Sequence, residues 1–111
     1  MPRDFNLYLD DILESINRIL QYIADQNFET FADDQKTVDA VVRNLEIIGE
    51  AARNLPDGVK EAMADIQWKK IIALRNILTH EYFGINKQIV WDVVQTKLHP
   101  LKSACEKVMK Q

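Results

Sequence analysis

The spacing of apolar residues between positions 35 and 55 is the feature that most constrains the fold. Apolar side chains recur there at alternating steps of three and four residues: Val38, Val41, Leu45, Ile48, Ala52 and Leu55. This spacing places them along one side of an α-helix and is typical of the buried seam of a helical bundle. We therefore predict a helix from about Gln35 to Asn54, with Asp33 or Asp34 as its N-cap.

Apolar stripes of the same kind predict two other long helices. The first runs from about Asp4 to Asp25, and the last from about Lys87 to Lys110. Asn86 is the expected cap of the last helix, and Pro100 is expected to bend it because proline removes a backbone donor and clashes with the preceding turn.

The remaining segments are shorter. The sequence DQNFETFADDQ is expected to be a polar connection. Pro56 ends the helix before it, and Asp57 is a candidate cap for a short helix through Ala64. A further helix begins near Ile66 and carries the sequence WKKIIALRNILTH.

The composition supports a single helical domain. The 111 residues include only three glycines and three prolines, and they suffice for one core but not two. We predict an all-α, antiparallel bundle of four to five helices that spans residues 1–111 as one domain. The formal net charge of −3 argues against broad, non-specific adhesion to nucleic acid, although it permits a local basic cleft.

Several other classes of protein are not expected. The longest apolar run, Ile71 to Leu74, is far too short to cross a membrane, and the first residues do not resemble a secretion signal. Cys105 is the only cysteine, so an internal disulfide is excluded and a cytoplasmic location is expected. His80 and His99 are nineteen residues apart, and no spacing typical of metal ligands is present, so neither a metal nor a cofactor is expected.

One position interrupts the apolar stripe of the helix near Ile66. That stripe passes through Trp68, Ile71, Arg75, Leu78 and Tyr82. A guanidinium keeps its charge among such neighbours, and burying it without partners is costly. Either Glu46 and Glu50 on the neighbouring helix form a structural ion pair with Arg75, or Arg75 faces phosphate or water in a cleft.

Three more polar residues accompany Arg75 in the sequence LRNILTHEYFGI. Five positions along a continuous helix rotate a side chain by roughly 140°, so His80 shares the cleft of Arg75 only if the helix frays or turns there. A histidine at a helix C-terminus also has a structural role, because its charge interacts favourably with the macrodipole. Tyr82 returns to the Arg75 face, where a core-edge aromatic is the structural alternative. Asn76 either orients a neighbour or lies in solvent.

The spacing Arg75, four residues, His80, one residue, Tyr82 resembles the R-x4-H-x-Y motif of HEPN-domain toxins of the HepT type. The sequence RNLEIIGEAARNLP, from Arg43 to Pro56, is similar to the second-helix signature of that family. With the VW pair at positions 90–91, the resemblance covers the chain from position 7 to about position 98. Two departures, Gln67 before the tryptophan and Thr79 before the histidine, leave the motif residues intact.

The resemblance implies a HEPN fold that acts as a homodimer, with the motifs of both protomers facing one cleft. It implies the toxin of a toxin–antitoxin pair that cleaves RNA without a metal, with Arg75 and His80 as catalytic residues and Asn76 as support. The implied partner is an MntA-like nucleotidyltransferase antitoxin, which silences the toxin by transferring AMP from ATP to Tyr82. A structured RNA such as tRNA is one candidate substrate.

The chemistry of the residue types agrees with this expectation. Histidine can give or take a proton near neutral pH, and arginine can bind two phosphoryl oxygens at once. One His80 supplies half of an acid–base pair, and a two-fold dimer would supply the other half. The alternatives are a non-catalytic helical binding partner of a nucleotidyltransferase and a purely structural homodimer, in both of which Arg75 is only a strut.

Overall fold

The computed structural model describes residues 4–79 and 86–109, and within these ranges the side chains of residues 75–79 are not described. These residues form six α-helices and no strand. The helices are α1 (Phe5–Tyr22), α2 (Phe28–Asp33), α3 (Gln35–Arg53), α4 (Asp57–Glu61), α5 (Trp68–Thr79) and α6 (Lys87–Met109). The predicted all-α class is confirmed.

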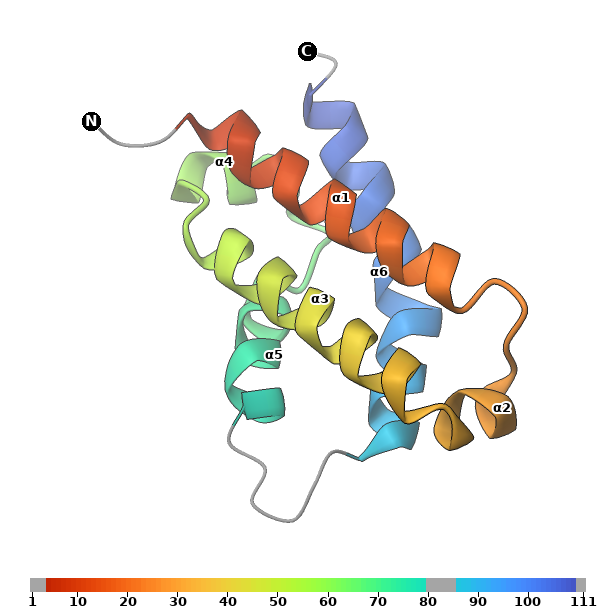
Figure 1. The fold of residues 1–111 in the computed structure, drawn as a ribbon. Helices are drawn as coiled ribbons and strands as arrows, with labels where there is room; N and C mark the ends of the chain where they lie inside the picture. Colours follow the sequence, from red (N-terminus) through yellow and green to blue (C-terminus); the bar gives the residue numbers. More distant parts are fainter. Residues whose placement is uncertain (1–3, 80–85, 110–111) are drawn as a thin grey trace.

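Helix α3 is the hub of the arrangement (Figure 1). It packs against α1 along one side and against α5 on another, while α1 also contacts α6. The short helix α2 touches both α3 and α6. The C-terminal end of α5 and the N-terminal end of α6 lie at the bottom of Figure 1, whereas α1 begins and α6 ends at the top.

The core is built from the apolar stripes that the sequence shows. All six apolar positions of the seam predicted between residues 35 and 55 are buried, the last of them, Leu55, just beyond the end of α3. Five of the six positions of the apolar stripe of α6 are buried as well. The α6 members are Val90, Val94, Leu98, Leu101 and Cys105, while the sixth, Val108, is half-buried. Burial of these faces is the main favourable term that holds a bundle together.

Helix α2 corrects the prediction of a polar connection after α1. Asn27 caps α2 through a reciprocal capping box, in which its Oδ1 accepts from the Thr30 amide at 2.9 Å and its own amide donates to Thr30 Oγ1 at 3.0 Å. Phe31 is fully buried and lies 5.1 Å, centroid to centroid, from Trp91 of α6. The capping box and one buried aromatic residue therefore form a helix in a segment whose composition is polar.

Several helix ends differ from expectation. Helix α1 ends at Tyr22 rather than near Asp25, α4 ends at Glu61 rather than Ala64, and α5 begins at Trp68 rather than near Ile66. The N-cap of α4 is Pro56, without a side-chain hydrogen bond, so the prediction that Asp57 caps this helix was wrong. Asp34 caps α3 as predicted.

The last helix continues through its proline. Pro100 lies inside α6 and is exposed, so its ring faces away from the core. The Asn86 side chain accepts a hydrogen bond from the Ile89 amide at 3.1 Å, which confirms it as the cap of α6. The structure therefore has one long final helix that starts at a defined residue.

Candidate active site

The predicted site residues lie at the junction between α5 and α6. Arg75 and Asn76 belong to the second half of α5, which ends at Thr79, but their side chains are not described. His80 and Tyr82 lie outside the described residues. The predictions that His80 joins Arg75 in one cleft, and that Tyr82 lies on the same face, therefore stay predictions.

Contacts at the start of α5 and further along it hold the backbone of Arg75 in place. At its start, the Trp68 indole Nε1 donates to the carbonyl oxygens of Lys60 and Met63, each at 3.2 Å. Further along, Ile71 and Leu74 are buried in the core, and α5 packs against α3. Arg75 thus directly follows a buried residue, and its backbone position is set by the α3–α5 contact.

The start of α6 is fastened to α2. Lys87 Nζ donates to the backbone carbonyl oxygen of Ala32 at 2.8 Å. One turn later, Trp91 packs against Phe31 and stands edge-on to Phe28 at 6.5 Å between ring centroids. These contacts fix the position at which the chain enters α6. Lys87, the first residue of that helix, is seven residues after His80 in the sequence.

The two anchors have a common consequence for the predicted site. The segment with the R-x4-H-x-Y motif begins on a helix held by α3 and ends where a helix held by α2 starts. The two helices that provide the anchors, α2 and α3, are distant in sequence from the motif. Sequence reasoning missed the role of Lys87 and Trp91, although the Asn27–Thr30 capping pattern was a readable signal for α2.

The polar strip of α3 contains the carboxylates proposed as structural partners of Arg75. Glu46 Oε2 lies 3.6 Å from the Arg43 guanidinium, and their side chains are 22% and 71% exposed. Glu50 is exposed one turn further on. Because the Arg75 side chain is not described, its ion pair with either carboxylate stays a prediction. The Arg43–Glu46 pair is largely solvated and contributes little to stability.

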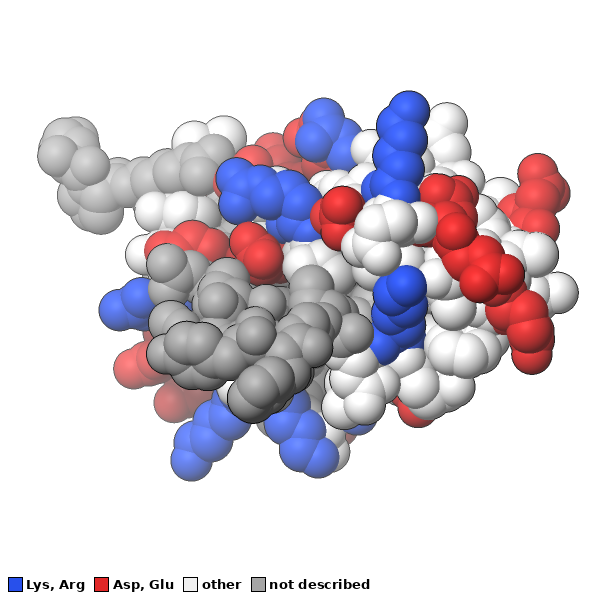
Figure 2. All heavy atoms as spheres, turned by 60° about the horizontal axis from the view of Figure 1, so that its bottom comes forward, with Lys and Arg blue, Asp and Glu red and all other residues white. Residues whose placement is uncertain are grey.

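Charges of both signs are mixed around the junction of α5 and α6. Figure 2 shows Lys and Arg side chains interspersed with Asp and Glu side chains on this face. Lys69 and Lys70 are exposed in the first turn of α5. Lys97 of α6 donates to Gln67 Oε1 at 3.2 Å. Such a face favours selective contacts with a polyanion over broad electrostatic adhesion.

Clear pKa shifts in the described part of the chain occur at structural positions. Burial, aided by the neighbouring Glu106 carboxylate, raises the pKa of the Cys105 thiol to about 12. Hydrogen bonds from Thr37 lower the pKa of Asp34 at the start of α3. Within residues 4–79 and 86–109, no three acidic, histidine or cysteine side chains are grouped to hold a metal ion. None of the helices described there has an apolar stretch long enough to cross a bilayer.

Comparison with known proteins adds what the geometry leaves open. The model of the family described as "Ribonuclease HepT-like" matches residues 12–108. A Methanocaldococcus jannaschii protein named "Putative RNase MJ0127" is 43% identical over 99 residues, which is 88% of this chain and 82% of that protein. A Thermococcus cleftensis protein named "Probable ribonuclease HepT" is 39% identical over 110 residues, 99% of this chain and 100% of that protein. No solved structure matches the chain significantly.

Proposed function

Because the chain belongs to the HepT-like ribonuclease family, we propose that it is a metal-independent endoribonuclease and the toxin of a toxin–antitoxin pair. The observation that supports the proposal most is that the family match, residues 12–108, includes the whole R-x4-H-x-Y motif. In this proposal Arg75 and His80 are catalytic, Asn76 supports them, and Tyr82 is the residue through which the enzyme is silenced.

The proposed reaction is an internal transfer at one RNA phosphate. His80 of one protomer takes the proton of a ribose 2′-hydroxyl, whose oxygen then bonds to the adjacent phosphorus. The bond from phosphorus to the 5′-oxygen of the next nucleotide breaks, and that oxygen receives a proton from a second acid. The products are a 2′,3′-cyclic phosphate and a 5′-hydroxyl. Arg75 remains charged and binds the phosphoryl oxygens as negative charge grows on them.

This reaction requires two proton-transferring groups, whereas the motif supplies one histidine per chain. We therefore propose a homodimer in which the partner's copy of the motif supplies the second acid. Two-fold symmetry would bring the same residues from both chains to one cleft. The anchoring of α5 on α3 and of α6 on α2 supports such a role, because a shared cleft needs its two halves to be positioned by rigid elements.

Silencing would act on the same segment. A nucleotidyltransferase antitoxin would bind ATP, and the Tyr82 hydroxyl oxygen would attack the α-phosphorus with release of pyrophosphate. The attached AMP would place a negative charge and an adenosine two residues from His80. A modified Tyr82 would thus compete with RNA phosphate for the cleft through both charge and volume.

The catalytic assignment is tested by His80→Ala, with His99→Ala as its matched control. His99 is exposed on α6 and is not part of the motif. We expect His80→Ala to abolish RNA cleavage by purified protein and growth arrest on expression, with helicity and mass in solution unchanged. His99→Ala should behave as the wild type. Cleavage retained by His80→Ala would refute the assignment and favour a non-catalytic binding partner.

The modification site is tested by intact mass. Protein produced together with its nucleotidyltransferase partner should gain one or more AMP units, and Tyr82→Phe should gain none. Tyr22→Phe is a suitable control because Tyr22 is exposed at the end of α1 and distant from the motif in sequence. An unchanged gain in Tyr82→Phe would place the modification on another residue.

A further inference from the structure

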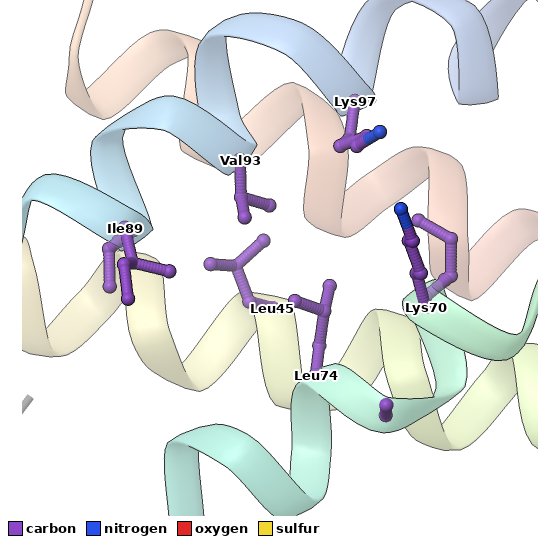
Figure 3. A pocket seen from close by; sticks show the side chains of 9 residues that line it. Leu45, Lys70, Leu74, Ile89, Val93 and Lys97 are labelled. Carbon is purple, nitrogen blue, oxygen red and sulfur yellow. The ribbon is translucent and has the colours of Figure 1, made fainter. Parts of the chain in front are cut away.

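Helix α5 has a hollow on each of two sides. Towards α6, a groove of about 320 Å³ is lined mainly by aliphatic side chains, among them Leu45, Leu74 and Val93 (Figure 3). Towards α4, a second hollow of about 350 Å³ is lined by Trp68 and by charged side chains. The two hollows share no residue of α5, and at about 100° per residue the two sets point in roughly opposite directions. Of the two, the hollow beside α4 combines an aromatic ring with groups that can recognise a polar ligand.

The indole of Trp68 forms a fixed part of the wall of this hollow. Its Nε1 donates to the carbonyl oxygens of Lys60 and Met63, each at 3.2 Å. These hydrogen bonds use the only donor of the ring, so the part of the half-buried indole that lines the hollow is apolar. Ile72, one turn later, is also half-buried and extends this apolar surface. A flat aromatic surface held in place in this way suits the stacking of a nucleic-acid base.

Charged side chains surround the apolar surface. Lys69 is exposed and has no hydrogen bond or ion pair in the described part of the chain. Asp57 and Glu61 are exposed and four residues apart on α4, so their carboxylates lie on the same side of that helix. Asp57 Oδ1 lies 3.8 Å from Lys60 Nζ, and because the Asp57 side chain is 94% exposed this pair is weak. The rim thus offers one cation for a phosphate and two carboxylates for hydrogen-bond donors.

The hollow beside α4 lies on the side of α5 that carries two of the proposed site positions. Positions 75 and 76 follow Trp68 and Lys69 by seven residues each, which is close to two full turns of the helix. Along the helix axis this separation is about 10 Å, the rise of roughly three stacked nucleotides. A strand with one phosphate at position 75 can therefore reach the hollow with a neighbouring nucleotide.

The charges of the rim also indicate which base the hollow would accept. Carboxylates accept hydrogen bonds, and cytosine carries an exocyclic amino group that donates them. Uracil has the same ring size but carries a carbonyl oxygen at that place, which the carboxylates would repel. The phosphate of the same nucleotide must lie away from Asp57 and Glu61, on the side of Lys69. The base would therefore point towards α4 and the phosphate towards α5.

We propose that the hollow between α4 and α5 binds one unpaired base of the RNA substrate, and binds cytosine in preference to uracil. Trp68 stacks on the base, Lys69 binds its phosphate, and Asp57 and Glu61 accept hydrogen bonds from its amino group. The inference rests on the proposed ribonuclease function and adds a recognition site that lies outside the R-x4-H-x-Y motif. These residues position the strand and select the base, and they take no part in the proton transfers.

The phosphate contact is tested by Lys69→Gln, with Lys70→Gln as the matched control. Both lysines are exposed in the first turn of α5, but Lys70 lines the groove on the opposite side. The probe is a fluorescein-labelled, 2′-O-methylated oligocytidylate, which lacks the attacking hydroxyl, and binding is measured by fluorescence anisotropy at several salt concentrations. For Lys69→Gln we expect the Kd to rise by about tenfold. Its plot of log affinity against log salt should become shallower by about 0.7, the contribution of one phosphate contact.

Lys70→Gln should change neither the Kd nor the salt dependence. A lysine with only a structural role would not alter the salt dependence, so an unchanged slope in Lys69→Gln would overturn the inference. With cleavable RNA, Lys69→Gln should raise KM and leave kcat close to that of the wild type.

The selection of the base is tested by comparing 2′-O-methylated oligocytidylate and oligouridylate of equal length. We expect the wild type to bind the oligocytidylate about tenfold more tightly. The double variant Asp57→Asn, Glu61→Gln should lose most of this preference. Asp10→Asn, Glu14→Gln is its matched control, because these two carboxylates are also exposed and four residues apart on one helix, α1. Equal affinity of the wild type for both oligonucleotides would overturn the assignment of the base.

The stacking contact is tested by two substitutions of one residue. Trp68→Leu removes the aromatic surface and should raise the Kd by about tenfold or more, whereas Trp68→Phe keeps a ring and should recover most of the affinity. Circular dichroism checks the helicity of both variants. The Lys69 and carboxylate variants change only exposed side chains, so their outcome does not depend on how the Trp68 variants fold.

The outcomes separate this inference from the proposed function. If the wild type cleaves RNA but the Lys69 and Trp68 variants bind the oligocytidylate as the wild type does, the hollow is not a base site, while the ribonuclease proposal stands. If these variants weaken binding as expected but the wild type never cleaves RNA, the base site stands and the catalytic proposal fails.

Discussion

Asp34 shows how one carboxylate sets the start of the central helix. Its Oδ2 accepts from Thr37 Oγ1 at 2.6 Å, and its Oδ1 accepts from the Thr37 amide at 3.1 Å. These hydrogen bonds favour the ionised form, so they hold the pKa of Asp34 below the ordinary value of 3.8. Gln26 Nε2 adds a third hydrogen bond at 3.1 Å, which ties the segment between α1 and α2 to the start of α3.

The lowered pKa predicts the pH dependence of stability. Since the folded pKa lies below the unfolded one, the contribution of Asp34 is fully present above about pH 3.8 and is lost as pH falls through the folded pKa. We expect Asp34→Ala to lower the thermal midpoint at pH 7, and its difference from the wild type to shrink below pH 3.8. Asp33→Ala, an exposed neighbour, should show little effect. A constant difference well below pH 3.8 would contradict this role.

The caps of two helices were predictable from single residues, but the buried polar contacts were not. Asp34 and Asn86 cap their helices as predicted, because a short polar side chain just before an apolar stripe can accept hydrogen bonds from the unpaired amides of the first turn. Asn44 is 6% exposed within α3, where its Nδ2 donates to the Ala40 carbonyl oxygen at 2.9 Å. Its Oδ1 has no partner among the described residues. Nothing in the sequence distinguishes Asn44 from a surface residue of the same helix.

At the scale of elements, α2 links the core to the start of α6. Phe31 is fully buried and packs against Trp91, while Phe28 in the same helix is only half-buried. Lys87 adds a hydrogen bond to the end of α2 at 2.8 Å. The helix is short, so tertiary packing rather than intrinsic propensity must hold it.

The packing of α2 predicts unequal effects for its two phenylalanines. Phe31→Ala should lower the free energy of unfolding by about 3–5 kcal/mol, because it removes a fully buried ring and leaves a cavity. Phe28→Ala should cost less, since its ring meets Trp91 only edge-on at 6.5 Å. Urea denaturation followed by circular dichroism measures both. Equal losses would contradict the packing described for Trp91.

The long helices were predictable from periodicity, whereas α2 was not. The α3 seam was read correctly because six apolar residues repeat at helical spacing along one face. The segment around Phe31 has too few apolar residues for such a stripe, and its helix depends on contacts with Trp91, sixty residues later. The periodicity of apolar residues predicts only the buried face of a single helix. Helix α2 instead depends on its contacts with α6.

At the scale of the whole molecule, the proposed site needs two chains. If cleavage uses one His80 from each protomer, a mixed dimer of wild type and His80→Ala has only half of the acid–base pair. With equal amounts of both proteins after exchange of subunits, about a quarter of the dimers carry two intact histidines. We expect RNA cleavage to fall to about a quarter of that of the same total amount of wild type.

The control for this mixture is wild type combined with His99→Ala, which should retain full activity. An activity of one half with His80→Ala would mean that each protomer cleaves independently. The assignment of Arg75, His80 and Tyr82 came from the motif and the family, because helical spacing alone places His80 roughly 140° from Arg75. Periodicity within one chain gives no sign of a second chain, so the expectation of a dimer came from the family resemblance and from the need for a second proton-transferring group.

The placement of the two chain ends has a practical consequence. Helix α1 begins and α6 ends at one pole of a molecule that is 41 Å long, while α5 and α6 meet at the opposite pole (Figure 1). A fluorescent protein or affinity tag joined to either end would be carried away from the α5–α6 junction. Labelled versions should therefore keep their behaviour, which makes this fold convenient for following such a protein inside living cells.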